Sequence, residues 1–124
     1  MQTYCLDINP RAFMAISQQT KTVEVRANKI SNGVNYGAIK KGDKIIFTSA
    51  NVSLLCSVKQ VNYYKNLVEL FSNEDASKVL SSKKTIDEGI ELIEAISDYK
   101  QVIRKNGVFA IHIKPIIRSR KNTN

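Results

Sequence analysis

With 124 residues, 43% of them hydrophobic, the chain is long enough for one core and too short for two domains of ordinary size. No stretch approaches the roughly 20 consecutive apolar residues of a membrane span, and no basic segment leads into an apolar run at the start. We therefore expect a cytoplasmic protein without membrane contact, with one domain at residues 3–116 and a basic, flexible tail at residues 117–124.

The formal net charge of +8 comes from 19 Lys and Arg against 11 Asp and Glu, and the acids are unevenly placed. Five of the acids lie between Asp87 and Asp98, so most of the chain is strongly basic. A polyanion is the natural partner of such a field. A lysine-rich composition that serves only solubility is the alternative, and net charge alone leaves both open.

The two cysteines, Cys5 and Cys56, lie far apart among apolar neighbours and form no Cys-x-x-Cys pair. This pattern is typical of reduced core residues. The chain contains one histidine and shows no metal-ligand spacing. We expect neither a metal nor a cofactor.

The first third of the chain combines strand and helix signals. Residues 3–8 alternate loosely and stop at Asn9, which predicts a strand and then a helix over residues 10–18 with Asn9 as its N-cap. The β-branched alternation of residues 21–26 predicts a strand with two different faces. Residues 27–41 are rich in Asn, Gly and Lys and are predicted to form an irregular loop.

The middle of the chain indicates two longer strands joined by a turn. Gly42 lies in a predicted tight turn, which leads into a strand over residues 44–49. Residues 52–64 predict a second strand that is long enough to contain a β-bulge. A short helix is expected over residues 66–72.

Residues 85–105 give the strongest helix signal. Thr85 is a candidate N-cap with Glu88 three residues later, and Gly107 follows the predicted end. One apolar stripe is expected to face the core, made of Ile86, Ile90, Ile93, Ile96, Tyr99 and Ile103. A last strand over residues 108–113 completes an α+β fold, in which five to six strands form a curved sheet or small β-barrel flanked by two to three helices.

The strand at residues 21–26 contains the main candidate site. The period of two places Val23 and Val25 on the core face and Thr22, Glu24 and Arg26 on the other. Lys21 begins on the core side, from which its ammonium is expected to reach the sheet edge. Lys and Arg bind phosphate, Arg also binds base edges, and a carboxylate accepts from amino or hydroxyl groups. From spacing alone, an inert solvated strand face is the more frequent outcome.

The order Lys21, Thr22, Glu24, Arg26, followed by Gly42 and Asp43 before an apolar strand, resembles the Lys-Thr-x-Glu-x-Arg pattern of the ASCH family. The resemblance covers roughly residues 3–116, and its further matches are Pro10, Phe13, Ile16, Ile39, Lys41, Ile45, Phe47, Val58, Val61, Tyr63, Leu70, Gly107, Ala110, Ile111 and Ile113. It implies a PUA-like β-barrel with a cleft beside the motif strand, RNA or nucleotide binding, and enzymatic activity in some branches.

The chain departs from the family at two positions. Gln19 stands where a glycine usually precedes the motif lysine, which implies a differently shaped approach to the cleft. Members that hydrolyse acetylated cytidine have a Thr nucleophile where this chain has Glu24, so their mechanism does not transfer directly. Thr22 is no substitute unless it faces the cleft beside a base.

Three functions remain open from the sequence. The first is an RNA- or nucleotide-binding module that uses Lys21, Thr22, Glu24 and Arg26. The second is a hydrolase on RNA or a modified nucleoside, with Lys21 and Glu24 as its catalytic groups. The third is a protein-interaction or inhibitor protein. Weaker candidates for the binding surface are Ser49, Asn51, Arg118, Arg120 and Lys121, together with His112 and the tyrosines Tyr36, Tyr63, Tyr64 and Tyr99.

Overall fold

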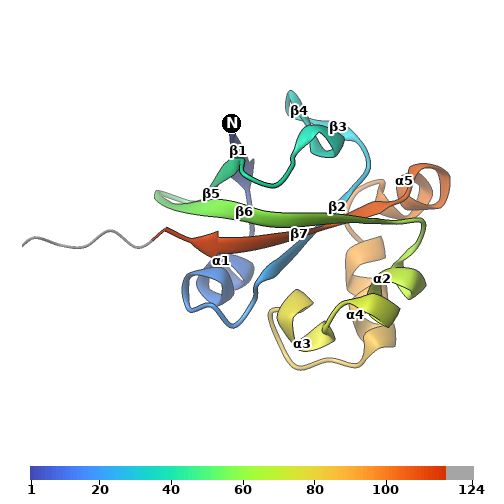
Figure 1. The fold of residues 1–124 in the computed structure, drawn as a ribbon. Coiled ribbons are helices and arrows are strands. Elements are labelled where there is room, and N and C mark those ends of the chain that lie inside the picture. Colours follow the sequence, from blue (N-terminus) through green and yellow to red (C-terminus); the bar gives the residue numbers. More distant parts are fainter. Residues whose placement is uncertain (117–124) are drawn as a thin grey trace, which may run out of the picture.

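Five strands form one curled sheet in the order β1-β5-β6-β7-β2 (Figure 1). The structure is a computed structural model and describes residues 1–116. β1 pairs with β5 in parallel, and the other three pairings are antiparallel. The strands are β1 (Thr3–Asp7), β2 (Val23–Ala27), β5 (Lys44–Ser49), β6 (Val52–Tyr64) and β7 (Val108–Pro115).

Short helices flank the sheet, and α2, α3 and α4 gather below it in the view of Figure 1. Local capping explains where four of them begin, because the side chains of Asn9, Asn66, Asp75 and Thr85 each accept from a backbone N–H of the first turn. The helices are α1 (Pro10–Ser17), α2 (Leu67–Asn73), α3 (Ala76–Val79), α4 (Ile86–Glu94) and α5 (Tyr99–Asn106). The α+β, PUA-like fold class predicted from the sequence is therefore confirmed, with five helices in residues 1–116.

The predicted loop at residues 27–41 is wrong in part, because it contains regular structure. β3 (Ile30–Ser31) and β4 (Val34–Asn35) form a small hairpin, and the 3-10 helix η1 (Tyr36–Ala38) follows. Asn32 and Gly33 form the turn with φ values of 50° and 79°. Both residues tolerate left-handed backbone, and Asn-Gly is a strong hairpin signal that the polar composition of the segment obscured.

The predicted single helix over residues 85–105 is also wrong, because it breaks into α4 and α5. Ser97 has a φ of 36°, and the Tyr99 N–H donates to Ile96 O in a tight turn. Ile86, the first residue of α4, and Ile96, next to the break, are 45% and 47% exposed instead of facing the core. The rest of the predicted stripe is buried or half-buried, and Thr85 and Glu88 form the expected capping box.

Two apolar clusters lie on opposite faces of the sheet. One packs Val23, Val25 and Ala27 of β2 against helices α2 to α5. The other fills the inside of the curled sheet and includes Leu6, Ile45, Phe47, Cys56, Ile111 and Ile113. Cys56 is buried as expected, whereas Cys5 is exposed, because it points away from Leu6 on the outer side of β1.

Several boundaries agree with the sequence. β5 spans the predicted residues, β6 contains the expected bulge as a register shift between Val58 and Gln60, and β7 extends two residues further than predicted. Gly42 forms its turn with a φ of 95°. Within residues 1–116, no helix is both long and apolar enough to cross a membrane.

Candidate functional site

β2 is buried on both faces, which places charged side chains inside the molecule. Its valines face the helices, so Glu24 and Arg26 face the inside of the curled sheet. Glu24 is 7% exposed and Arg26 is 9% exposed. The solvated strand face considered from the sequence is therefore wrong, because α1, β1 and η1 close over this side of the strand.

Lys21 lies just before β2 and is also buried, at 6% exposure. Its Nζ donates to the carbonyl of Val23 at 2.6 Å and to the carbonyl of Val79 at the end of α3, and it lies 3.4 Å from Glu24 Oε1. These partners account for the three donors of an ammonium group. The expectation that Lys21 reaches the sheet edge is wrong: it holds α3 and Glu24 in place.

Arg26 completes a buried charge cluster with Glu24. Its Nε donates to Glu24 Oε2 at 2.7 Å, and its two terminal nitrogens donate to Tyr36 Oη at 2.9 Å and to the carbonyl of Asp7 at 3.0 Å. The guanidinium carbon also lies 5.2 Å from the centre of the Tyr36 ring. Charge-assisted bonds of this kind fix both side chains in one geometry. We call Lys21, Glu24 and Arg26 the buried triad.

The triad changes the proton affinities of its members. Burial disfavours ionisation of Glu24, but the charges of Arg26 and Lys21 outweigh it and hold the pKa of that carboxyl below its ordinary value of 4.5. Burial lowers the pKa of Lys21 although Glu24 opposes the shift. Burial also disfavours the charged Arg26, but Glu24 outweighs it and raises the pKa of the guanidinium. Glu24 is therefore an ionised acceptor with little tendency to take up a proton.

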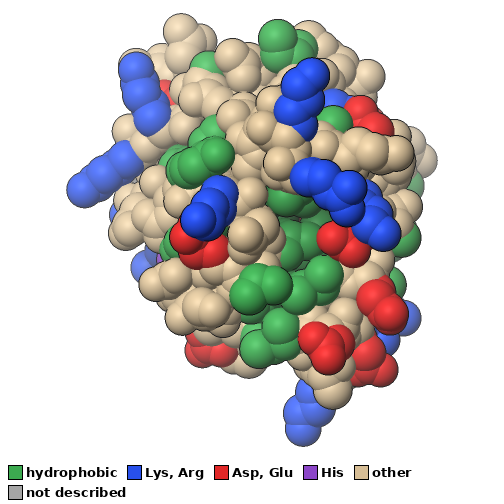
Figure 2. Space-filling view, turned by 90° about the vertical axis from the view of Figure 1, so that its right-hand side faces the viewer, with side chains coloured by type: hydrophobic (Ala, Val, Ile, Leu, Met, Phe, Trp, Pro, Cys, Tyr) green, Lys and Arg blue, Asp and Glu red, His purple; other side chains and the backbone are tan. Residues whose placement is uncertain are grey.

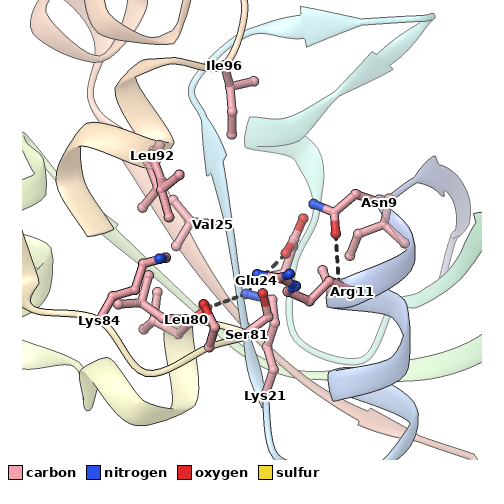
Figure 3. A pocket seen from close by; sticks show the side chains of 15 residues that line it. Asn9, Arg11, Lys21, Glu24, Val25, Leu80, Ser81, Lys84, Leu92 and Ile96 are labelled. Atoms are coloured by element: carbon pink, nitrogen blue, oxygen red, sulfur yellow. Dashed lines mark hydrogen bonds and ion pairs between the residues drawn. The ribbon is translucent and has the colours of Figure 1, made fainter. Parts of the chain in front are cut away.

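A cleft of about 480 Å³ opens over Glu24 between α1, the 80–85 segment and α4 (Figure 3). Its volume lies in the range of small-molecule sites. Arg11 and Lys84 stand at opposite sides of the cleft, on α1 and on the 80–85 segment. The wall is largely apolar and includes Ile8, Val25, Val79, Leu80, Leu92, Ile93 and Ile96, of which Leu92 and Ile96 are about half exposed.

The lining combines a buried acceptor, exposed apolar side chains and cations at the rim. Leu92 is 50% exposed. Figure 2 shows a face on which hydrophobic side chains gather in a hollow, with Lys, Arg, Asp and Glu side chains around it. Such a surface suits a ligand with a flat apolar body, hydrogen-bond donors and negative charge.

A second, smaller cavity of about 270 Å³ meets the cleft at Ile96, which lines both. Arg26 lines it from β2, Asp7 from β1 and Tyr99 from α5. The β3–β4 hairpin contributes Ser31 and Asn32. We call this space the Arg26 cavity.

The remaining predicted residues lie away from both cavities or outside the described residues. Thr22 is half-buried, and its backbone bonds to Lys78 and Ile113, but its side chain lines neither cavity. Ser49 and Asn51 flank the β5–β6 turn, also away from them. Arg118, Arg120 and Lys121 lie outside the described residues.

His112 belongs to a separate polar cluster on the helix-facing side of the sheet. Its Nε2 lies 2.8 Å from Oε1 of Glu74, a carboxylate whose side chain is 4% exposed. The other oxygen of Glu74 accepts from Tyr64 at 2.6 Å and from Asn62 at 2.8 Å. Burial, followed by this carboxylate, raises the pKa of Tyr64 to about 12. The cluster ties the end of α2 to β6 and β7.

The sequence analysis missed Arg11, Lys84 and the exposed wall residues as parts of the cleft. Arg11 directly follows the Asn9 and Pro10 helix start, and Lys84 directly precedes the Thr85 cap, so both are local neighbours of recognised signals. Their convergence depends on how α1 and α4 are placed around β2. Within residues 1–116, no group of three or more His, Cys, Asp or Glu side chains is arranged to hold a metal.

Gln19 takes the conformation that its position requires. It has a φ of 63°, in the left-handed region where glycine is favoured, and it links α1 to Lys21. The chain therefore carries the strain of a side chain there. The expectation that the departure from glycine reshapes the approach to the cleft stays a prediction.

Comparison with known proteins supports the fold. No family model and no curated protein matches the sequence. Among solved structures, hypothetical protein PH0355 is 28% identical with a TM-score of 0.79, over 92% of this chain and 99% of that chain. Protein PF0455 from Pyrococcus furiosus is 27% identical with a TM-score of 0.72, over 92% and 97%.

A mutant of ZmASCH from Zymomonas mobilis has the same fold at lower similarity. It is 13% identical with a TM-score of 0.60, over 90% of this chain and 73% of that chain. At this identity the likeness concerns the course of the chain.

Proposed function

We propose that this chain, an ASCH-like domain by its fold, binds single-stranded RNA or a nucleotide in the cleft above Glu24. The observation that carries the proposal is the buried Glu24 carboxylate, paired with Lys21 and Arg26, at the base of a cleft of about 480 Å³ with apolar walls. A nucleobase has a flat apolar face and exocyclic amino groups, and carboxylates accept from such groups. An unpaired base is required, because paired bases do not enter a cavity.

The charge around the cleft supports a polyanionic ligand. Arg11 and Lys84 are exposed cations on opposite sides of the opening, where backbone phosphates of a bound strand would lie. The formal charge of +8 adds long-range attraction. Leu92 and Ile96 offer exposed apolar surface for a base between these cations.

The chemistry of the triad favours binding over hydrolysis. A general base should have a pKa near the working pH, whereas Glu24 has a lowered one. The ammonium donors of Lys21 are already bonded to two backbone carbonyls and paired with Glu24, and Thr22 does not line the cleft. Among the described contacts, none joins a nucleophile to a general base at Glu24.

The test is binding of fluorescein-labelled single-stranded RNA of mixed sequence, measured by anisotropy from 25 to about 300 mM salt. Arg11→Gln and Lys84→Gln should each weaken binding and reduce the salt slope by about 0.7, the value for one single-strand phosphate contact. Lys59→Gln is the matched control, because Lys59 is an exposed lysine on β6 that lines neither cavity.

The expected result is weaker binding in both cleft variants and unchanged binding in the control. Equal effects of all three substitutions would mean that only overall charge matters, and the cleft would lose its assignment. Absence of RNA and nucleotide binding by the wild type would overturn the proposed function. Melting temperatures of the variants should stay within a few degrees of the wild type, because all three residues are exposed.

A further inference from the structure

The Arg26 cavity is a separate space with its own donors. It lies across Ile96 from the cleft and has a volume of about 270 Å³. Arg26 reaches it from the buried triad, and Lys29, Ser31 and Asn32 also line it, three residues whose side chains contain hydrogen-bond donors. A lining with several such residues is a composition suited to an anion.

Arg26 keeps donors for a ligand. A guanidinium has five N–H groups, and in Arg26 one is bonded to Glu24, one to Tyr36 and one to the carbonyl of Asp7. Among the described residues, two N–H groups therefore remain, both on the terminal nitrogens. The other bonds hold the guanidinium rigid, so that a ligand meets an already oriented fork.

The charges around the cavity are mixed. The buried triad contains two cations and one carboxylate in a poorly solvated place. Two acids lie near the cavity: Asp7 lines it and accepts from the Thr48 hydroxyl at 2.6 Å, and Asp98 pairs with Lys29 at 2.7 Å. An anion there would therefore be held by the hydrogen-bond donors of Arg26 and not by an excess of positive charge.

We propose that the Arg26 cavity binds a phosphate group, and that this is the phosphate of the nucleotide whose base lies in the cleft. The assignment to a nucleotide rests on the proposed function, whereas the phosphate site rests on the cavity itself. The cleft and the Arg26 cavity share Ile96 as a lining residue, so one ligand can extend from the first space into the second.

Cys5 provides a probe at the edge of the cavity, because it is exposed and is one of the residues that line it. Alkylation of Cys5 by iodoacetamide, followed by mass spectrometry, should slow several-fold when inorganic phosphate or a nucleoside monophosphate is bound. Sodium chloride at equal ionic strength is the control for charge screening. Cys56 does not interfere, because burial raises the pKa of its thiol to about 12 and hides it from the reagent.

Affinity for small ligands tests the link to the cleft. A nucleoside 5′- or 3′-monophosphate should bind about tenfold more tightly than its nucleoside, the gain expected of one charge-assisted contact. Lys29→Gln should reduce this gain and the protection of Cys5, at small cost in stability because the Lys29–Asp98 pair is solvated. Lys59→Gln should change neither.

The outcomes separate the two proposals. If RNA binds and Arg11→Gln weakens it, but phosphate and nucleotides leave Cys5 alkylation unchanged, the phosphate site is overturned and the proposed function stands. If phosphate protects Cys5 and no nucleoside, nucleotide or RNA binds, the phosphate site stands and the proposed function falls. Equal affinity for nucleoside and nucleotide overturns the shared ligand.

Discussion

Glu24 lies 3.4 Å from Lys21 Nζ and 2.7 Å from Arg26 Nε, with both cations buried beside it. A buried charge is tolerable only when it is paired and hydrogen-bonded, and here one carboxylate serves two cations. Removal of that carboxylate leaves two buried cations without their shared counter-charge. Glu24 therefore stabilises the fold in addition to its proposed role in binding.

The lowered pKa of Glu24 predicts how stability depends on pH. A carboxyl whose folded pKa lies below its unfolded value stabilises the protein fully above about pH 4.5, and this contribution is lost as pH falls through the folded pKa. Glu24→Gln should cost about 3 to 5 kcal/mol at pH 7 and should flatten the decline in stability below about pH 4.5. Urea unfolding followed by circular dichroism measures both effects.

Glu91→Gln is the matched control for this prediction, because Glu91 is an exposed acid on α4. It should leave the pH profile close to that of the wild type. Some acid sensitivity should persist in Glu24→Gln, since backbone bonds from Gln2 and Lys40 outweigh burial and hold the pKa of Asp43 low. Identical profiles for wild type and Glu24→Gln would contradict the ionised triad.

Residue identities in the triad could be predicted from the sequence, but their partners could not. The alternation of residues 21–26 correctly separated the valines from Glu24 and Arg26. The partners of the charged residues outside β2 are a carbonyl at Val79, a carbonyl at Asp7 and a hydroxyl at Tyr36, and Lys21 also donates to the carbonyl of Val23. Backbone carbonyls exist at every residue, so no sequence signal distinguishes the three that are used.

At the scale of elements, the link between α1 and β2 sets the start of the site. Gln19 N–H donates to Ile16 O, and Thr20 and Lys21 both donate to Ala15 O, which closes the end of α1. The left-handed φ of 63° at Gln19 makes this closure possible. The following Lys21 is thereby directed under α3.

Gln19→Gly should be neutral or should stabilise the protein by up to about 1 kcal/mol, because relief of left-handed strain exceeds the entropy cost of glycine. Gln18→Gly is the control, since Gln18 is right-handed with a φ of −86° and gains nothing from glycine. That control should destabilise by about 0.5 to 1 kcal/mol. Thermal unfolding distinguishes the two; a larger loss in Gln19→Gly than in Gln18→Gly would refute the strain argument.

Element types could be predicted from local signals where caps and turns are clear. They could not be predicted where tertiary packing determines whether a helix continues or breaks. The start of α4 at its Thr85 capping box and the bulge in β6 agree with the sequence. The break at Ser97 does not, because the helical period continues through it in sequence. A bend that lets Tyr99 and Ile103 pack against β2 outweighs the propensity for one longer helix.

At the scale of the whole molecule, charge and cavity act at different ranges. The net charge of +8 attracts a polyanion from a distance and falls off with salt, whereas the cleft and the Arg26 cavity act only on contact. Overall charge should therefore control the rate and salt dependence of association. The cavities should control which group is held.

Deletion of residues 117–124 separates these contributions. It removes three of the 19 basic residues, Arg118, Arg120 and Lys121, and should lower the salt slope of RNA binding by up to about 2. The higher affinity for a nucleoside monophosphate than for its nucleoside should remain, because the phosphate contact is assigned to the Arg26 cavity. Anisotropy titration of the full and shortened chains measures this, and loss of the nucleotide gain would argue against that assignment.

The α+β class, most element positions, the basic character and the strand that contains the triad could all be predicted from the amino-acid sequence. These features depend on periodicity, caps and composition, which are local along the chain. The burial of β2 on both faces, the inward direction of Lys21 and the placement of Arg11 and Lys84 around one cleft could not. Such features depend on the pairing of β2 with β7 and on helices packed from distant segments, and no local pattern specifies contacts across that separation.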